Sequence, residues 1–229
     1  MQHVAIAVGM PTCAKKIIGS LKQSGDFIID IIAFDGYELI QKLHSSSYVP
    51  DIFVIDINLT IMDGVAINFF LSKYFPLSKI ISLSLYLDHA IIHQAIETGA
   101  KAYLVQDEAE SFILTAIQKI QCGKLYIDPR TKIDVGVLTK DFSVAVIQGT
   151  GIKNLPGLSK REKMFIILNA TTLGYDQIAR LMFVELKTIQ TYFDRVAKKC
   201  NVRSRQALTL YSLQNRLARV AQFPSYYKE

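Results

Sequence analysis

The first 128 residues alternate short apolar runs with longer amphipathic segments, and this alternation restricts the fold more than any other feature of the chain. Segments between and after the runs keep apolar residues at the helical period of 3.6 and end near Gly or Ser. Strands that alternate with helices predict a doubly wound α/β domain, in which helices cover both faces of a parallel sheet. The five predicted strands are 3–8, 27–34, 51–56, 79–85 and 102–105.

The third apolar run ends abruptly in Asp56, within the stretch DIFVIDINLTIMDG at 51–64. Functional groups of open parallel sheets gather at the carboxyl ends of the strands. Asp56 is therefore the first candidate for a functional carboxylate in this domain, and its chemistry depends on the residues that surround it.

The block around Asp56 resembles the third strand and following loop of bacterial response-regulator receiver domains. ISLSLY and then ETGAKAYLVQDEAESFILTAIQKI resemble the fourth strand through the last helix of the same domain, so the likeness covers roughly 3–128. It implies a flavodoxin-like receiver domain over 1–128, in which an aspartate at the position of Asp56 accepts a phosphoryl group with the help of Mg²⁺. By the same resemblance, Ser84 takes the place of the family's hydroxyl residue and Tyr103 that of its switch aromatic.

Two parts of that phosphoryl site are missing from the chain. Gly9 and Met10 stand where the family has an acidic pair, and Gln106 stands where it has a lysine. Mg²⁺ would be held mainly by Asp56, and an aspartyl phosphate would lack its counter-charges. We therefore expect a degenerate receiver that phosphorylation of Asp56 does not control, with no catalytic residue, no metal site and no cofactor. Mg²⁺ would be required only if Asp56 were phosphorylated.

Two alternatives for this domain remain open. It could be a conventional phosphorelay receiver that is phosphorylated at Asp56. It could also be a module that binds a small ligand or a protein at a pocket lined by Gly9, Met10 and Ser84.

Several classes of protein are disfavoured by features that the sequence lacks. No Ser/His/Asp or Cys/His arrangement can be assembled from its motifs, so we do not expect an enzyme. No apolar stretch is long enough to cross a bilayer, and the first residues lack a signal-peptide pattern. Three widely spaced cysteines suit a reducing compartment. We expect a cytoplasmic protein without a membrane partner.

Positive charge is concentrated in the last third of the chain. Residues 1–154 contain 13 Lys and Arg against 15 Asp and Glu, whereas residues 155–229 contain 13 against 5. A basic module attached to a near-neutral one indicates a domain that binds a polyanion and a domain that controls it.

The basic segment predicts an all-α domain with four helices, at about 159–170, 174–182, 185–200 and 203–216. Ser159 followed by Glu162 predicts a capping box at the start of the first helix. The second helix turns through VEL into the third, which is the arrangement of a helix-turn-helix motif. The third helix has an apolar stripe and an opposite polar stripe. The apolar stripe comprises Ile189, Phe193, Val196 and Cys200, and the polar stripe comprises Lys187, Gln190, Thr191, Asp194 and Lys198.

LSKRE and IARLMFVELKTIQTYFDRVAKKCNVRSRQAL resemble, without a gap, the LuxR-type (GerE-like) DNA-binding domain of NarL/FixJ response regulators. The resemblance implies a DNA-binding domain over 155–229 and a sequence-specific transcription regulator that binds double-stranded DNA as a homodimer. It places Gln190, Thr191 and Asp194 at base edges and Lys187 and Thr188 at the start of the helix. The remaining implied DNA contacts, mainly to phosphates, are Arg195, Lys198, Lys199, Arg203 and Arg205.

Two residues of the third helix depart from that family pattern. Glu185 stands where Ser or Thr usually caps the helix, and Glu is a weaker cap. Asp194 is acidic where the family is often basic or polar, so it could accept a hydrogen bond from a cytosine amino group or reject wrong sites.

The predicted linker, 129–154, contains two apolar runs, IDVGVL and FSVAVI, on either side of TKD. Two β-branched runs three residues apart suggest a hairpin. Such a hairpin could dock on the receiver domain or pair across a dimer, and we slightly favour local packing.

Overall fold

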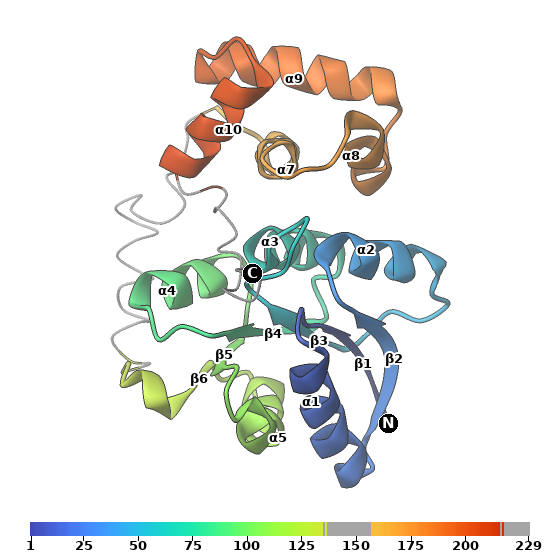
Figure 1. The fold of residues 1–229 in the computed structure, drawn as a ribbon, viewed down its shortest axis with the longest axis vertical. Coiled ribbons are helices and arrows are strands. Elements are labelled where there is room, and N and C mark those ends of the chain that lie inside the picture. Colours follow the sequence, from blue (N-terminus) through green and yellow to red (C-terminus); the bar gives the residue numbers. More distant parts are fainter. Residues whose placement is uncertain (135, 137–156, 216, 218–229) are drawn as a thin grey trace, which may run out of the picture. The chain divides into compact units, whose positions relative to one another are not determined.

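A computed structural model describes residues 1–134, 136, 157–215 and 217 (Figure 1). These residues form two compact units, an N-terminal α/β unit and a C-terminal helical unit. The predicted combination of an α/β fold with an all-α fold is confirmed.

The N-terminal unit is built on a six-stranded sheet in which every pair of neighbouring strands is parallel. The strand order is β2-β1-β3-β4-β5-β6, so the connection reverses direction between β1 and β3. Ligand sites of doubly wound sheets form at this reversal, outside the carboxyl ends of the strands. The strands are β1 (Gln2–Ala7), β2 (Phe27–Ala33), β3 (Ile52–Asp56), β4 (Lys79–Ser84), β5 (Ala102–Val105) and β6 (Tyr126–Ile127).

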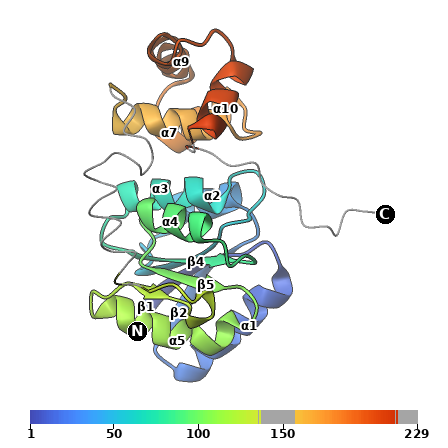
Figure 2. The ribbon, with the colours of Figure 1, turned by 90° about the vertical axis from the view of Figure 1, so that its left-hand side faces the viewer.

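Helices cover both faces of the sheet (Figure 2): α1 and α5 lie on one face, and α2, α3 and α4 lie on the other. Apolar side chains of α1 and α5, among them Ile17 and Ile113, pack on Val54 and Leu83 of the central strands to form a buried core. The helices are α1 (Pro11–Ser24), α2 (Gly36–Ser45), α3 (Gly64–Tyr74), α4 (His89–Glu97) and α5 (Ala109–Gln121).

The sequence predicts five strands, and the structure adds a sixth. β6 pairs Tyr126 with Ala102 and Ile127 with Tyr103 of β5. Two residues are too few to show an alternation of apolar and polar side chains, which is why the pattern did not reveal them. A short 3₁₀ helix, η1 (Pro129–Thr131), follows in the segment predicted as linker. Apart from residues 133, 134 and 136, the predicted hairpin lies outside the described residues.

The C-terminal unit contains the four predicted helices, and their ends agree with the prediction to within two residues. The predicted capping box is present: the Ser159 Oγ accepts the Glu162 amide at 3.2 Å, and the Glu162 carboxylate accepts the Ser159 amide at 2.7 Å. The helices are α7 (Lys160–Asn169), α8 (Tyr175–Met182), α9 (Leu186–Cys200) and α10 (Arg205–Gln214). Among the residues that the structure describes, no helix has the length and apolar composition needed to span a bilayer.

Candidate functional site

α9 has the two faces that the sequence predicts. Ile189 and Val196 are buried in the C-terminal unit, and Phe193 and Cys200 are half-buried beside them. The opposite face is open to solvent along the whole helix. Its exposed side chains are Lys187, Gln190, Thr191, Asp194, Arg195 and Lys198, with Thr188 half-buried.

The turn between α8 and α9 is closed by a residue in the left-handed conformation. Phe183 adopts φ 56° and ψ 49°, and its amide donates to the Arg180 carbonyl at 3.2 Å. The Val184 amide donates to the Ala179 carbonyl at 3.0 Å, so the last carbonyls of α8 are satisfied as the chain changes direction. This tight turn is what presents the start of α9 to solvent.

The sequence predicts a weak cap from Glu185, and in the structure the Glu185 side chain makes no capping hydrogen bond at the start of α9. The Glu185 carboxylate instead lies 3.3 Å from the ammonium of Lys187, and both side chains are exposed. An exposed pair of this kind contributes little to stability. It does reduce the net positive charge at the start of the helix.

Two exposed polar residues of α9 are joined by a hydrogen bond. The Gln190 Nε2 donates to the Asp194 Oδ1 at 3.1 Å, one helical turn away. The Thr191 hydroxyl turns back to the helix and donates weakly to the Lys187 carbonyl at 3.4 Å. These hydrogen bonds therefore restrain the polar side chains of α9 before any ligand is bound.

The adjacent lysines at the end of α9 have different environments. Both lysines are exposed, but only Lys199 makes an ion pair among the described residues: its Nζ lies 2.9 Å from both carboxylate oxygens of Glu162 and donates to the Gly157 carbonyl at 2.6 Å. Burial alone would raise the pKa of Glu162, but hydrogen bonds from Lys199 and the Ser159 amide hold this pKa below its usual value. Lys199 thus neutralises a buried carboxylate within the C-terminal unit.

Arg205 also makes internal contacts. Its guanidinium donates to the carbonyls of Leu173 and Thr171, the latter at 3.3 Å, and lies 5.0 Å from the centroid of the Tyr175 ring. These contacts attach the start of α10 to the loop before α8. Arg203, by contrast, is exposed.

In the N-terminal unit, Asp56 lies at the carboxyl end of β3 and is only 3% exposed. Its Oδ1 accepts the Asn58 amide at 2.8 Å, and its Oδ2 accepts the Gly9 amide at 3.4 Å. Burial raises the pKa of Asp56 to about 6, although the two amide hydrogen bonds oppose the rise. No cationic side chain of the described residues lowers the pKa of Asp56.

The other predicted receiver positions gather at the same edge of the sheet, at the ends of β4 and β5. The Ser84 Oγ accepts the Tyr86 amide at 3.1 Å, and the buried Tyr103 hydroxyl donates to the Tyr86 carbonyl at 2.7 Å. The backbone N–H of Gln106 donates to the Ser84 carbonyl at 2.7 Å. Gln106 is 4% exposed, and its buried Nε2 has no hydrogen-bond partner within the part of the chain that the structure describes.

These positions offer a poor donor set for Mg²⁺. Asp56 supplies one carboxylate, while Gly9 and Met10 have no side-chain oxygen and Gln106 supplies no charge. Mg²⁺ requires an octahedral set of hard oxygen ligands, partly from carboxylates. Over residues 1–134, 136, 157–215 and 217, no cluster of three or more His, Cys, Asp or Glu side chains could hold a metal ion. The residues at this edge do not fit the ion.

A cation near the end of β5 comes from Arg130, which no sequence motif singles out. The Arg130 Nη2 lies 2.6 Å from the Oδ2 of the fully buried Asp128 and donates to the Val105 carbonyl at 3.2 Å. The Asp128 Oδ2 also accepts the Val105 amide at 3.0 Å, and the guanidinium lies 4.8 Å from the centroid of the Phe112 ring. The only sequence signal was that Arg130 is the sole arginine before residue 155.

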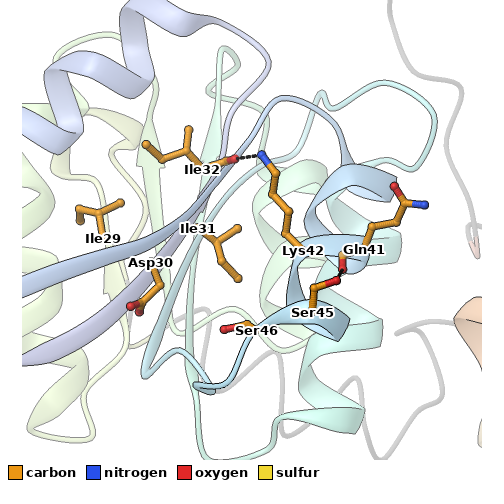
Figure 3. Close-up of a pocket in the computed structure, with 8 residues that line it drawn as sticks. All are labelled: Ile29, Asp30, Ile31, Ile32, Gln41, Lys42, Ser45 and Ser46. Atoms are coloured by element: carbon orange, nitrogen blue, oxygen red, sulfur yellow. Dashed lines mark hydrogen bonds between the residues drawn. The ribbon is translucent and has the colours of Figure 1, made fainter.

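An open groove of about 540 Å³ lies between the edge strand β2 and α2 (Figure 3). Its walls combine three isoleucines and Asp30 of β2 with polar residues on the side of α2, which are Gln41, Lys42, Ser45 and Ser46. The Lys42 ammonium is already engaged, because it donates to the Ile32 carbonyl at 2.7 Å and lies 2.6 Å from the Glu38 carboxylate. None of the site residues predicted from the sequence lines this groove.

Comparison with known sequences identifies relatives of the C-terminal unit and of the whole chain. Residues 156–212 match the family described as bacterial regulatory proteins, luxR family. The chain is similar to the oxygen regulatory protein NreC of Staphylococcus carnosus, with 28% identity over 193 residues that cover 83% of this chain and 86% of that protein. NreC of a Staphylococcus aureus strain is 27% identical over 200 residues, which cover 86% of this chain and 90% of that protein.

Solved structures with the same fold extend over both units. The RcsB response regulator of Salmonella typhimurium matches with a TM-score of 0.52 and 23% identity, covering 92% of this chain and 97% of that chain. A complex of the response regulator RcsB with DNA matches with a TM-score of 0.51 and 21% identity, covering 92% and 96%. These likenesses confirm the predicted fold of a receiver-type α/β unit followed by a helix-turn-helix unit.

Proposed function

We propose that this NarL/FixJ-type response regulator, a DNA-binding regulator of transcription, reads DNA through α9 as a homodimer and is not controlled by phosphorylation of Asp56. The observation that carries the proposal is the exposed polar face of α9 in a helix-turn-helix unit. The second helix of such a motif enters the major groove, where its side chains reach base edges.

The exposed side chains of α9 support a division of roles. Gln190, Thr191 and Asp194 are assigned to base edges, and Lys187 and Thr188 to the DNA backbone at the start of the helix. Exposed cations can neutralise phosphates and release counterions. We assign this role to Arg195, Lys198 and Arg203, all of which are exposed.

Lys199 and Arg205 are better explained by their internal contacts. Lys199 bonds to Glu162, and Arg205 bonds to the loop before α8. A cation that neutralises a buried carboxylate or caps several carbonyls is not free to move toward a phosphate without a cost. We therefore assign both residues to holding α9 and α10 in place, which affects DNA binding only indirectly.

Dimerisation through the last helix is supported by an exposed apolar residue. Leu210 of α10 is 59% exposed although it belongs to a small helical unit with its own core. A two-fold symmetric dimer places two recognition helices on half-sites one turn of DNA apart, or a multiple of that distance. The RcsB structure that resembles this chain was solved as a complex with DNA, which supports DNA binding here.

The surroundings of Asp56 support control by something other than phosphorylation. Among the residues that the structure describes, its carboxylate is bound only by the backbone amides of Gly9 and Asn58, and the residue in the place of the family's lysine is the neutral Gln106. A dianionic phosphoryl group needs cationic partners. One observation bears on the alternative of a ligand-binding receiver: among the described residues, the buried Nε2 of Gln106 has only the thiol of Cys13 beside it as a polar neighbour, and no oxygen or nitrogen acceptor. The remaining alternative, a conventional phosphorelay receiver, requires Asp56 to react without those partners.

The cellular location is part of the same proposal. All three cysteines, Cys13, Cys122 and Cys200, are unpaired thiols. Unpaired thiols suit a reducing compartment, and a DNA-binding regulator must reach the chromosome. We therefore place the protein in the cytoplasm.

The test is selection of binding sites from a pool of random DNA duplexes by the full chain, followed by affinity measurements on the selected duplexes. The proposal predicts a defined sequence made of two related half-sites at a fixed spacing. Equal binding of selected and unselected duplexes would show that the protein does not read sequence. A single unpaired site would retain base reading by α9 but contradict the homodimer.

A further inference from the structure

We propose that Gln190 and Asp194 act as one unit that selects adenine in the major groove, with Gln190 contacting the base and Asp194 positioning the Gln190 amide. The inference rests on the proposed function, because it requires α9 to lie in the major groove. It goes beyond that function because it names the base that is selected. It also explains how Asp194, although acidic, can assist the binding of a polyanion.

The two side chains lie on the exposed face of α9, four residues apart, and are joined by the 3.1 Å contact between the Gln190 Nε2 and the Asp194 Oδ1. An ionised carboxylate only accepts hydrogen bonds. The NH₂ side of the Gln190 amide must therefore face Asp194, and the carbonyl oxygen Oε1 must point away from it. Asp194 thus decides which of the two possible orientations the amide adopts.

This orientation leaves one donor and one acceptor of Gln190 side by side. The amide nitrogen carries two hydrogens, and the bond to Asp194 uses one of them. The second hydrogen lies on the same side of the amide as Oε1 if Asp194 takes the hydrogen trans to that oxygen. Adenine presents its N7 acceptor next to its N6 amino donor in the major groove, so the free edge of the amide matches adenine with two hydrogen bonds.

The same arrangement disfavours guanine. Guanine presents two acceptors, N7 and O6, so Oε1 would face O6 without a hydrogen between them. If the amide turned over to avoid this clash, Oε1 would face the Asp194 carboxylate instead. The negative charge of Asp194 therefore raises the free energy of the flipped orientation of Gln190, which increases the preference for adenine over guanine.

The neighbouring polar side chains contact groups other than Gln190 and Asp194. The Thr191 hydroxyl donates to the Lys187 carbonyl, and the Lys187 ammonium lies 3.3 Å from Glu185. A Gln side chain loses considerable rotamer freedom on binding, and the bond to Asp194 removes part of that freedom before the DNA arrives. A pre-oriented amide costs less to immobilise at the base edge.

The competing hypothesis is that Asp194 itself accepts a hydrogen bond from a cytosine amino group. In that case the contact between the two side chains would break on binding, and each residue would read its own base. The two hypotheses differ in the number of base positions that depend on Gln190 and Asp194. The proposed unit makes one position depend on both residues, whereas direct reading makes two positions depend on one residue each.

The experiment compares base preferences of the full-length wild type with Gln190→Ala, Asp194→Ala and the double variant, by site selection and by affinity for single-base variants of the selected duplex. Lys198→Gln serves as a control that removes an exposed charge from the same face. We expect one position per half-site at which wild type prefers adenine, on the order of tenfold. Gln190→Ala and Asp194→Ala should each weaken the preference at that position, and the double variant should weaken it no further.

A chemical substitution in the DNA checks the atoms involved. Replacing the selected adenine by 7-deazaadenine removes the N7 acceptor, and this should weaken wild-type binding severalfold while leaving Gln190→Ala unaffected. Lys198→Gln should lower the affinity for all duplexes and keep the base profile. Thermal unfolding of each variant confirms that the fold is retained, since both side chains of the pair are exposed.

Two results would overturn the inference. The first is a change at different base positions in the two single variants, or a preference for cytosine that depends on Asp194 alone. The second is wild-type binding that 7-deazaadenine does not affect. Loss of all sequence preference in the wild type would instead remove the proposed function on which the inference rests, so the two failures are distinguishable.

Discussion

The ammonium of Lys199 in α9 lies 2.9 Å from both carboxylate oxygens of Glu162 in α7, and Glu162 is only 2% exposed. Because Glu162 also accepts the Ser159 amide, this ion pair joins the end of α9 to the cap of the first helix of the unit. The position of α9 thus depends on a charge pair formed by residues 37 apart in the sequence.

Removing the Lys199 charge should destabilise the C-terminal unit. Lys199→Met leaves the Glu162 carboxylate buried without its cation, and we expect a loss of about 2 kcal/mol in the free energy of unfolding. Denaturation with urea measures the effect. Lys198→Met is the matched control, because Lys198 is exposed and should change the free energy of unfolding by less than about 0.5 kcal/mol. Equal effects of the two substitutions would contradict the assignment.

Lys198 and Lys199 should also differ in their effect on DNA binding, because only Lys198 is assigned to a phosphate contact. Lys198→Gln should weaken binding to every duplex by a similar factor, because a phosphate contact does not depend on base sequence. The slope of log affinity against log salt concentration should fall in magnitude by about one per protomer. Titration of a fluorescent duplex at several salt concentrations gives this slope. A loss of affinity confined to particular sequences would place Lys198 at a base edge instead.

The buried carboxylate of Asp56 should make the N-terminal unit less stable at neutral pH than at acidic pH. Burial raises its pKa from 3.8 to about 6, so the folded protein binds a proton more tightly than the unfolded chain does. The stabilisation by protonation is complete below pH 3.8, and it is lost as the pH rises through about 6. Above that pH the ionised group costs about 3 kcal/mol.

Asp56→Asn removes this dependence on pH. At pH 8 the variant should unfold with a free energy up to about 3 kcal/mol higher than that of wild type, and the difference should shrink at pH 5. Chemical denaturation at the two pH values measures both. An unchanged difference between pH 5 and pH 8 would mean that Asp56 stays ionised over this range and has a cationic partner.

Arg130 should be as important for the α/β unit as Lys199 is for the helical one. Arg130→Met leaves the fully buried Asp128 without its partner and removes the donor to the Val105 carbonyl, so we expect a loss of about 3 kcal/mol. Arg130→Lys keeps the charge but not the planar fork, and it should recover only part of the loss. Denaturation curves for the two variants test the order; equal stability of Arg130→Met and wild type would refute it.

Sequence patterns predicted the features of this protein that depend on neighbouring residues. The capping box at Ser159 and the apolar stripe of α9 follow from spacings of three, four and seven residues, and the buried strands follow from continuous apolar runs. The end of an apolar run placed Asp56 at the carboxyl edge of the sheet, and the resemblance to receiver domains placed Ser84 and Gln106 there.

Features that depend on distant pairing were not predictable in this way. The polar stripe of α9 includes Lys198 by its spacing, but nothing in that spacing shows that the next residue, Lys199, neutralises a carboxylate of another helix. β6 is too short to have a pattern, and Asp128 reaches Val105 across 23 residues. In each case the partner is supplied by tertiary packing, so only the folded chain identifies it.

Intact-mass spectrometry shows whether Asp56 can be phosphorylated at all, which control by phosphorylation requires. The purified chain is incubated with Mg²⁺ and acetyl phosphate, and its intact mass is compared with that of an Asp56→Ala control. Because Asp56 has no cationic partner within the described part of the chain and its neighbours do not fit Mg²⁺, we expect the mass to stay unchanged. A gain of one phosphoryl group that is absent from Asp56→Ala would contradict the account and identify Asp56 as a working phosphoacceptor.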